Sequence, residues 1–72
     1  MDDQERALSK TVAAKVRPQY QSWLKKSGDA QAYERAYSEL VKLVASAQHI
    51  SADKVKFASR EVLQEAMTLV TR

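Results

Sequence analysis

Few side chains in this 72-residue chain are of types that carry out catalysis. His49 is the only histidine, there is no cysteine, and Gly28 is the only glycine. No pair of acids stands at helical spacing from His49, so the pattern predicts no metal site. Ser46 and Ser51 are expected to be capping or surface residues rather than nucleophiles, and one glycine cannot build a phosphate-binding loop. We therefore expect a protein that is not an enzyme, with no catalytic residue, cofactor, metal ion or small-molecule ligand.

One aromatic residue, Phe57, departs from the pattern of its own segment. On a helical wheel of residues 52–71 it lies away from the apolar stripe formed by Val55, Val62 and Leu69. Its neighbours on that wheel are polar: Lys54, Arg60, Glu61 and Gln64. Because exposed aromatic residues beside arginine are typical of interface hot spots, the pattern predicts a protein interface. Its candidate residues are Phe57, Arg60, Glu61 and Gln64. The alternative is that Phe57 packs against the first helix or a bent terminus.

Basic residues are unevenly placed along the chain. Net charge is +3, from 12 Lys+Arg and 9 Asp+Glu, yet residues 6–26 contain six bases and no acid. Arg6, Lys10 and Arg17 line one flank of the expected helix. Such a flank suits the phosphates of nucleic acid, whose neutralisation releases counterions, and it suits an acidic protein equally well. A solvated helix face is the third interpretation.

Residues 44–55 resemble part of a helix-turn-helix. Ala45 matches the small residue of the first helix, Ile50-Ser51 matches the turn, and Val55 matches a buried position of the recognition helix. His49 stands where the motif usually has glycine, and Gln48 stands where it usually has an apolar residue. The resemblance implies that the side chains facing the DNA groove are Lys54, Lys56 and Arg60. A capped helical hairpin is the alternative explanation of the same residues.

Four aromatic residues flank the Ser27-Gly28-Asp29 turn: Tyr20, Trp23, Tyr33 and Tyr37. A hairpin of the first two helices would gather them at one end of the molecule. We expect this cluster to be core, with phenol hydroxyls reaching the rim; a small pocket is the alternative.

Helices must position all of these residues, because the chain has one glycine, one proline and no asparagine to build the turns of a β-protein. Apolar spacing predicts helices over about 3–26, 30–48 and 52–71. Pro18 is expected to kink the first helix or to break it into 3–16 and 18–26. Gly28 is expected to adopt a left-handed cap, and Asp29 and Ser51 to be N-caps. Ile50 and Val55 occupy the two positions of a hydrophobic staple.

Three amphipathic helices with short connections predict an all-α fold, an antiparallel three-helix bundle in a single small domain over residues 1–72. So short a chain buries a marginal core, so we expect self-association as a homodimer. No apolar run is long enough for a membrane span, and the absence of cysteine fits a reducing compartment. The sequence thus favours a cytoplasmic regulatory module that binds a protein partner through helix faces. A nucleic-acid-binding regulator that uses residues 44–60 or 6–26 is the alternative.

Overall fold

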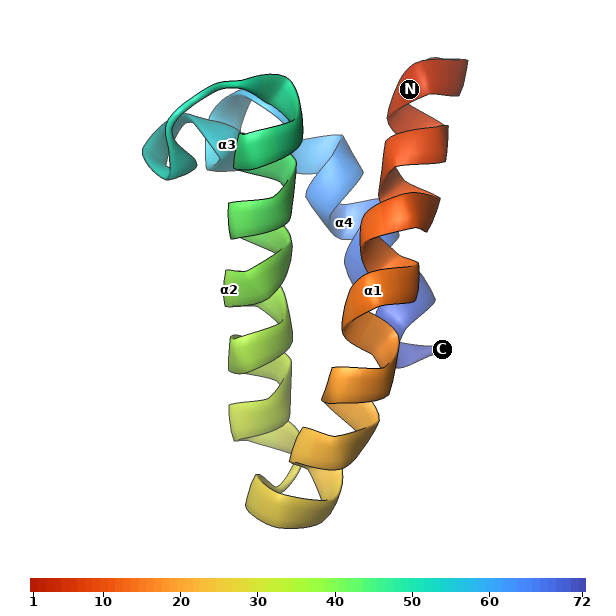
Figure 1. The fold of residues 1–72 in the computed structure, drawn as a ribbon, viewed down its shortest axis with the longest axis vertical. Coiled ribbons are helices and arrows are strands. Elements are labelled where there is room, and N and C mark those ends of the chain that lie inside the picture. Colours follow the sequence, from red (N-terminus) through yellow and green to blue (C-terminus); the bar gives the residue numbers. More distant parts are fainter.

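Four helices and no strand make up the computed structural model, which describes all 72 residues (Figure 1). The helices are α1 (Asp3–Ser27), α2 (Asp29–Gln48), α3 (Ala52–Ala58) and α4 (Arg60–Thr71). The all-α prediction is confirmed. The three-helix prediction is wrong in its last element, because the segment 52–71 forms two helices instead of one.

Helix α1 begins at a capping box. Asp2 Oδ1 accepts a 2.8 Å hydrogen bond from the Glu5 backbone N–H, and Glu5 Oε1 accepts a 3.2 Å bond from the Asp2 N–H. These bonds satisfy two donors that a helix start leaves unpaired. The helix then continues through Pro18 to Ser27, so the alternative of two separate helices, 3–16 and 18–26, is wrong. Pro18 and Ala14, whose carbonyl loses its partner, are both exposed, so that water can hydrate the freed carbonyl.

The turn at Gly28 differs in detail from expectation. Gly28 has a positive φ of 84°, but its ψ is 173°, so its backbone is not in the left-handed helical region that we expected. This combination of angles is essentially restricted to glycine. Gly28 is itself the N-cap of α2, and Asp29 is the first helical residue, so the prediction of Asp29 as the cap is off by one position.

The second turn, at residues 49–51, agrees more closely with the prediction from the sequence. His49 ends α2 in the left-handed conformation, with φ 57° and ψ 41°, and its N–H donates to the Ser46 carbonyl. Histidine tolerates positive φ better than most residues do. Ser51 is the N-cap of α3 as predicted, although its side chain makes no capping hydrogen bond. Ile50 packs against the core that contains Val55, as the staple requires.

The segment 52–71 changes direction at Ser59. This residue has φ −125° and ψ 32°, outside the helical region, and it is 3% exposed. Its hydroxyl hydrogen-bonds the Gln48 side-chain oxygen at the end of α2. Ser59 is therefore a buried, non-helical residue between α3 and α4, with a hydrogen-bond partner on α2. Beyond this break, α3 lies across the end of the bundle (Figure 1).

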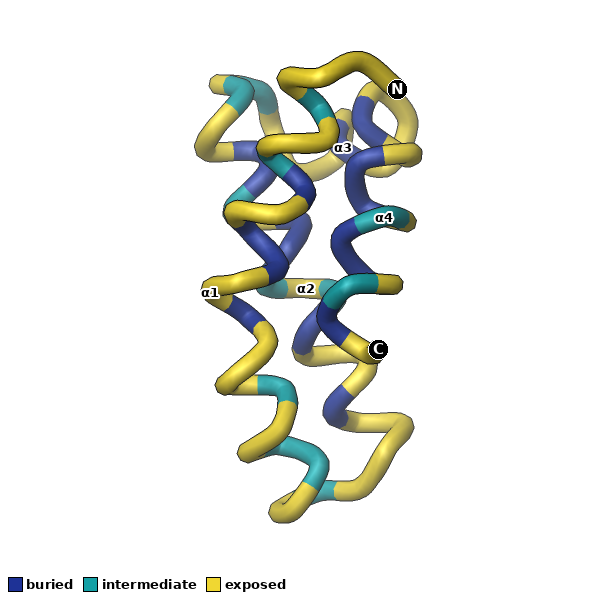
Figure 2. The backbone as a smooth tube through the Cα atoms, turned by 90° about the vertical axis from the view of Figure 1, so that its right-hand side faces the viewer, coloured by how far each residue is buried: buried dark blue, intermediate teal, exposed yellow.

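One apolar core joins the four helices. Helix α1 packs against both α2 and α4, and the neighbouring long helices α1 and α2 run in opposite directions (Figures 1 and 2). The residues that face inward include Val16, Leu40, Val44, Val55 and Val62, none of which has exposed surface. Because α3 contributes only Val55 to this core, most of its surface is left in solvent.

Candidate interaction surface

Two adjacent hollows lie on the surface next to α2. The first has a volume of about 490 Å³ and lies between α2 and α3, lined by Tyr33, Glu34, Tyr37, Ser38, Val41, Ala52, Asp53 and Lys56. The second, of about 440 Å³, lies between α2 and α4, and we call it the α2–α4 channel. It is lined by Tyr33, Tyr37, Lys56, Arg60, Leu63, Gln64, Met67, Thr68 and Thr71. The two hollows are neighbours, because three residues line both of them: Tyr33, Tyr37 and Lys56.

Helical spacing builds both walls of the channel. On α4 the lining residues recur at intervals of three and four, from Arg60 to Thr71. On α2 the wall consists of Tyr33 and Tyr37, one turn apart. Leu63 and Met67 are almost fully buried, whereas Tyr33 is 49% exposed. Leu63 and Met67 therefore lie beneath the channel with almost no exposed surface, and the side chains exposed along it are mostly polar, with Tyr33 at its edge.

Phe57 has 88% of its surface exposed, the largest fraction among the exposed large hydrophobic residues. On the seven-residue helix α3 it lies nearly opposite Val55, the residue that anchors α3 to the core. The alternative that Phe57 packs against the first helix is therefore wrong. Phe57 does not line either hollow; it lies on the outer crest of α3 beside them.

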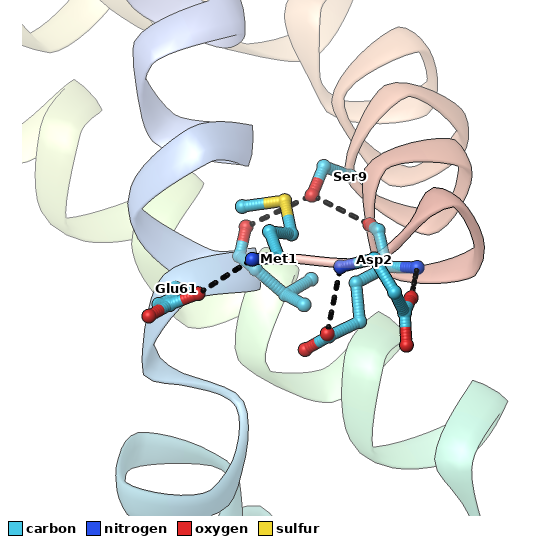
Figure 3. A network of polar contacts seen from close by, with 6 residues as sticks. Met1, Asp2, Ser9 and Glu61 are labelled. Atoms are coloured by element: carbon cyan, nitrogen blue, oxygen red, sulfur yellow. Dashed lines mark hydrogen bonds and ion pairs between the residues drawn. The ribbon is translucent and has the colours of Figure 1, made fainter.

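The four predicted interface residues do not form one patch. Arg60 and Gln64 line the α2–α4 channel, and Phe57 belongs to the preceding helix. The wheel that grouped them assumed one continuous helix, and the break at Ser59 invalidates it. Glu61 lies away from the channel lining and forms a 3.4 Å ion pair with the Met1 ammonium group (Figure 3). Its carboxylate is 68% exposed, so this pair contributes little to stability.

A buried serine on α1 fixes the beginning of α4. The Ser9 hydroxyl lies 2.9 Å from the Glu5 carbonyl oxygen of its own helix and 3.4 Å from the Val62 carbonyl oxygen of α4 (Figure 3). Ser9 has no exposed surface. No buried side-chain polar atom lacks a hydrogen-bond partner, so this interior offers no unpaired group that would call for a ligand.

The basic flank of α1 borders a third, smaller hollow. It has a volume of about 330 Å³ between α1 and α4 and is lined by Lys10, Ala13, Ala14, Arg17, Leu69 and Arg72. Arg17 Nη2 donates a 3.3 Å hydrogen bond to the Arg72 carbonyl oxygen. Of the three predicted residues, Lys10 and Arg17 therefore share one site and Arg6 lies outside its lining. Arg72 is a cation that the helical wheel of α1 did not include.

The helix-turn-helix resemblance holds for the turn and not for the helix after it. Ala45 and Val55 are buried, and His49 has the positive φ that glycine usually provides in that motif. Helix α3, however, ends at Ala58 after seven residues. Lys54 and Lys56 lie on α3 while Arg60 begins α4, so the three predicted groove-facing cations do not share one recognition helix.

The aromatic cluster divides between core and surface. Tyr20, Trp23 and Tyr37 are partly buried and pack against the core, whereas Tyr33 is exposed beside the two hollows. The core interpretation therefore holds for Tyr20, Trp23 and Tyr37. The alternative of one pocket lined by all four aromatic residues is wrong, because only Tyr33 and Tyr37 line a hollow. Three further residues of the channel were not predicted from the sequence: Met67, Thr68 and Thr71. Their helical spacing from Arg60, Leu63 and Gln64 is the signal that identifies this face.

Comparisons of the chain with family models, with curated proteins and with solved structures gave no match. None of the four helices combines the length and the apolar content that a membrane span requires. No group of three or more metal-ligating side chains lies together.

Proposed function

We propose that this chain is a small, non-enzymatic, cytoplasmic interaction module. It binds a protein partner through the outer crest of α3 and the adjoining α2–α4 channel. The observation that carries the proposal is the 88% exposure of Phe57 on the outer crest of α3. Exposed aromatic residues are typical of interface hot spots.

Exposure of Phe57 has no structural purpose in the isolated chain. The α3 helix is held by Val55 and by the Ser59–Gln48 hydrogen bond, and Phe57 contributes to neither. An aromatic ring in water costs free energy that burial against a partner would recover, at about 25 cal/mol per Å² of apolar area. A partner that covers α3 would therefore gain most of its affinity from this residue.

Partner capture from lysate of the native host tests the proposal. Immobilised wild-type chain is compared with Phe57→Ala and with Gln21→Ala, an exposed position on α1. We expect one protein to be retained in stoichiometric amount by wild type and Gln21→Ala and to be lost with Phe57→Ala. The melting temperatures should agree, because surface changes alter stability by less than about 0.5 kcal/mol. Equal capture by all three chains would refute the role of Phe57.

A second copy of the chain belongs to the same proposal. The core is small, and a homodimer would bury further apolar surface. Light scattering coupled to size-exclusion chromatography measures the molar mass directly. A dimer that persists on dilution supports self-association, and a monomer mass of 8.1 kDa at all concentrations contradicts it.

Nucleic-acid binding is the second candidate, favoured by the hollow between α1 and α4, which is lined by three cations and no acid: Lys10, Arg17 and Arg72. A gel shift against random duplex at two salt concentrations tests it, since phosphate contacts give a steep salt dependence. Lys10→Gln/Arg17→Gln should abolish the shift, and Lys25→Gln/Lys26→Gln, with the same change in charge, should retain it. Absence of a shift at low salt would exclude this function.

A further inference from the structure

We propose that the partner protein inserts an arginine side chain into the hollow between α2 and α3, next to the exposed Phe57. This inference rests on the proposed function and deepens it by naming a residue type that the partner presents. Phe57 does not line the hollow, so the hollow and the crest of α3 can be tested separately.

The hollow lies where a partner that covers Phe57 would reach it. Asp53 lines the hollow and precedes Phe57 by four residues on α3, so the two side chains lie one helical turn apart on the same face. Phe57 is 88% exposed. A partner segment that covers this ring therefore meets the α3 edge of the hollow as well.

The surface that the hollow exposes is mostly apolar, unlike that of the α2–α4 channel. Tyr33 and Tyr37 line it from α2, where they lie one turn apart, and Tyr33 is 49% exposed. Its volume of about 490 Å³ is within the usual range of ligand pockets. The hollow therefore has room for the aliphatic part of a long side chain beside tyrosine rings, whose faces attract cations.

Two carboxylates at the hollow have no cationic partner within the chain. Glu34 lines the hollow from α2 and Asp53 lines it from α3, and both residues are exposed. Neither belongs to one of the two ion pairs of the structure, and neither does Lys56, the one cation of the lining. Two acids against one base leave the lining with an excess of negative charge, which complements a cation from the partner.

Arginine fits this combination of aromatic rings and acids better than lysine does. Its planar guanidinium stacks on aromatic faces and carries five N–H donors in a fixed arrangement, so that it can contact a tyrosine ring and donate to carboxylates at the same time. Its aliphatic stem packs along apolar surface while the charged end stays near water. Arginine is also enriched among interface hot spots, as aromatic residues are.

A peptide probe tests the inference on the full chain. The acetylated tripeptide amide Leu-Arg-Leu is titrated into isotopically labelled protein, and the backbone amide signals are followed by NMR. We expect the shifted amides to lie in residues 33–41 and 52–57. The same tripeptide with citrulline, which has the shape of arginine without its charge, should bind about fivefold more weakly. The peptide with lysine should bind about twofold more weakly than the arginine peptide.

Charge variants of the lining should have effects of opposite sign. Glu34→Gln/Asp53→Asn should raise the Kd of the arginine peptide about fivefold, because both carboxylate charges are removed. Lys56→Gln should lower this Kd about twofold, because a competing cation is removed. A hollow that binds anions would reverse both effects.

Matched variants control for net charge and for the aromatic ring. Asp3→Asn/Glu65→Gln and Lys15→Gln repeat the two changes in net charge at residues outside the lining, and both should bind as wild type does. Tyr33→Ala should bind about threefold more weakly, whereas Tyr33→Phe should not, because the ring attracts the cation without its hydroxyl. Circular dichroism must show that each variant is folded, and a double variant that unfolds is replaced by Glu34→Gln alone.

Several outcomes would overturn the inference: no binding of the arginine peptide, shifted amides away from the hollow, equal binding of the citrulline or lysine peptide, or charge variants with no effect or the reverse one. Capture from the lysate separates this inference from the proposed function. If the native partner is lost with Phe57→Ala and retained by Glu34→Gln/Asp53→Asn, the proposed function stands and only this inference fails. If neither variant affects capture, the proposed function fails as well.

Discussion

Two helical segments of this protein, α1 and residues 52–71, have boundaries opposite to those that their local sequences predict. Helix α1 contains a proline at position 18 and is continuous over Asp3–Ser27, whereas residues 52–71 contain neither proline nor glycine and divide at Ser59. Intrinsic propensity predicts the reverse, since proline is the strongest helix breaker. The boundaries of these helices are therefore set by what each residue contacts in the fold.

The surroundings of Pro18 and Ser59 explain why α1 is continuous and why residues 52–71 divide into two helices. Pro18 is exposed, so the loss of its backbone hydrogen bond is compensated by water, and Val16 and Tyr20 on either side of it pack against the core. Ser59 is buried and its hydroxyl reaches Gln48 on another helix. Serine hydroxyls compete with helical hydrogen bonds, and burial of Val55 and Val62 then fixes α3 and α4 in separate directions.

The largest effect is expected where proline is removed. Pro18→Ala should raise stability by about 2 kcal/mol, because alanine restores a backbone donor and relieves the clash with the preceding turn. Thermal unfolding followed by circular dichroism should show a melting temperature higher by roughly 10 °C for a domain of this size. Gln19→Ala, at the neighbouring exposed position, should change it little. A lower melting temperature for Pro18→Ala would show instead that the core is built around the proline.

Truncation of the only core residue of α3 should have a comparable but opposite effect. Val55→Ala is expected to cost about 2 kcal/mol, from two buried methyl groups and the cavity that remains. Hydrogen exchange should show that amides 52–58 lose protection before those of α1. Val62→Ala, an equally buried valine on α4, should destabilise the chain without this selective loss. Uniform loss of protection in Val55→Ala would mean that α3 and the bundle unfold as one unit.

The hydrogen bond at the break should contribute about 1 kcal/mol, the usual net value for a neutral pair. A double-mutant cycle with Ser59→Ala and Gln48→Ala isolates it from other effects of each change. Urea unfolding supplies the four free energies. A coupling energy near zero would show that burial of Val55 and Val62 separates α3 from α4 without help from the serine hydroxyl.

The smallest effect is expected at His49, where the local sequence and the fold agree on a boundary. His49→Gly should stabilise the chain by less than about 1 kcal/mol, because glycine adopts positive φ without the steric cost of a Cβ. The control is His49→Ala, which keeps the Cβ and should not stabilise. A loss of stability in His49→Gly would indicate that a contact of the imidazole contributes more than the removal of steric strain at positive φ. Tertiary contacts would then also set the helix boundary at this turn.

The sequence alone determined the helical class, the first two helices to within a residue or two, and both turns. These features depend on hydrophobic spacing and on single residues such as Gly28 and His49, whose effects are local. It also identified Phe57 as a residue off the apolar face, because burial on a helix is periodic.

Only the tertiary structure decided where residues 52–71 divide and which side chains share a surface. At the break, Ser59 hydrogen-bonds Gln48, eleven positions away in the sequence, and no helical wheel represents such a contact. That break separates Phe57 from Arg60 and Gln64, and the packing of α2 beside α4 brings Tyr33 to the same channel as Met67. Contacts between helices depend on relative orientation, which is set by the packing of the whole core and not by the spacing within any one segment.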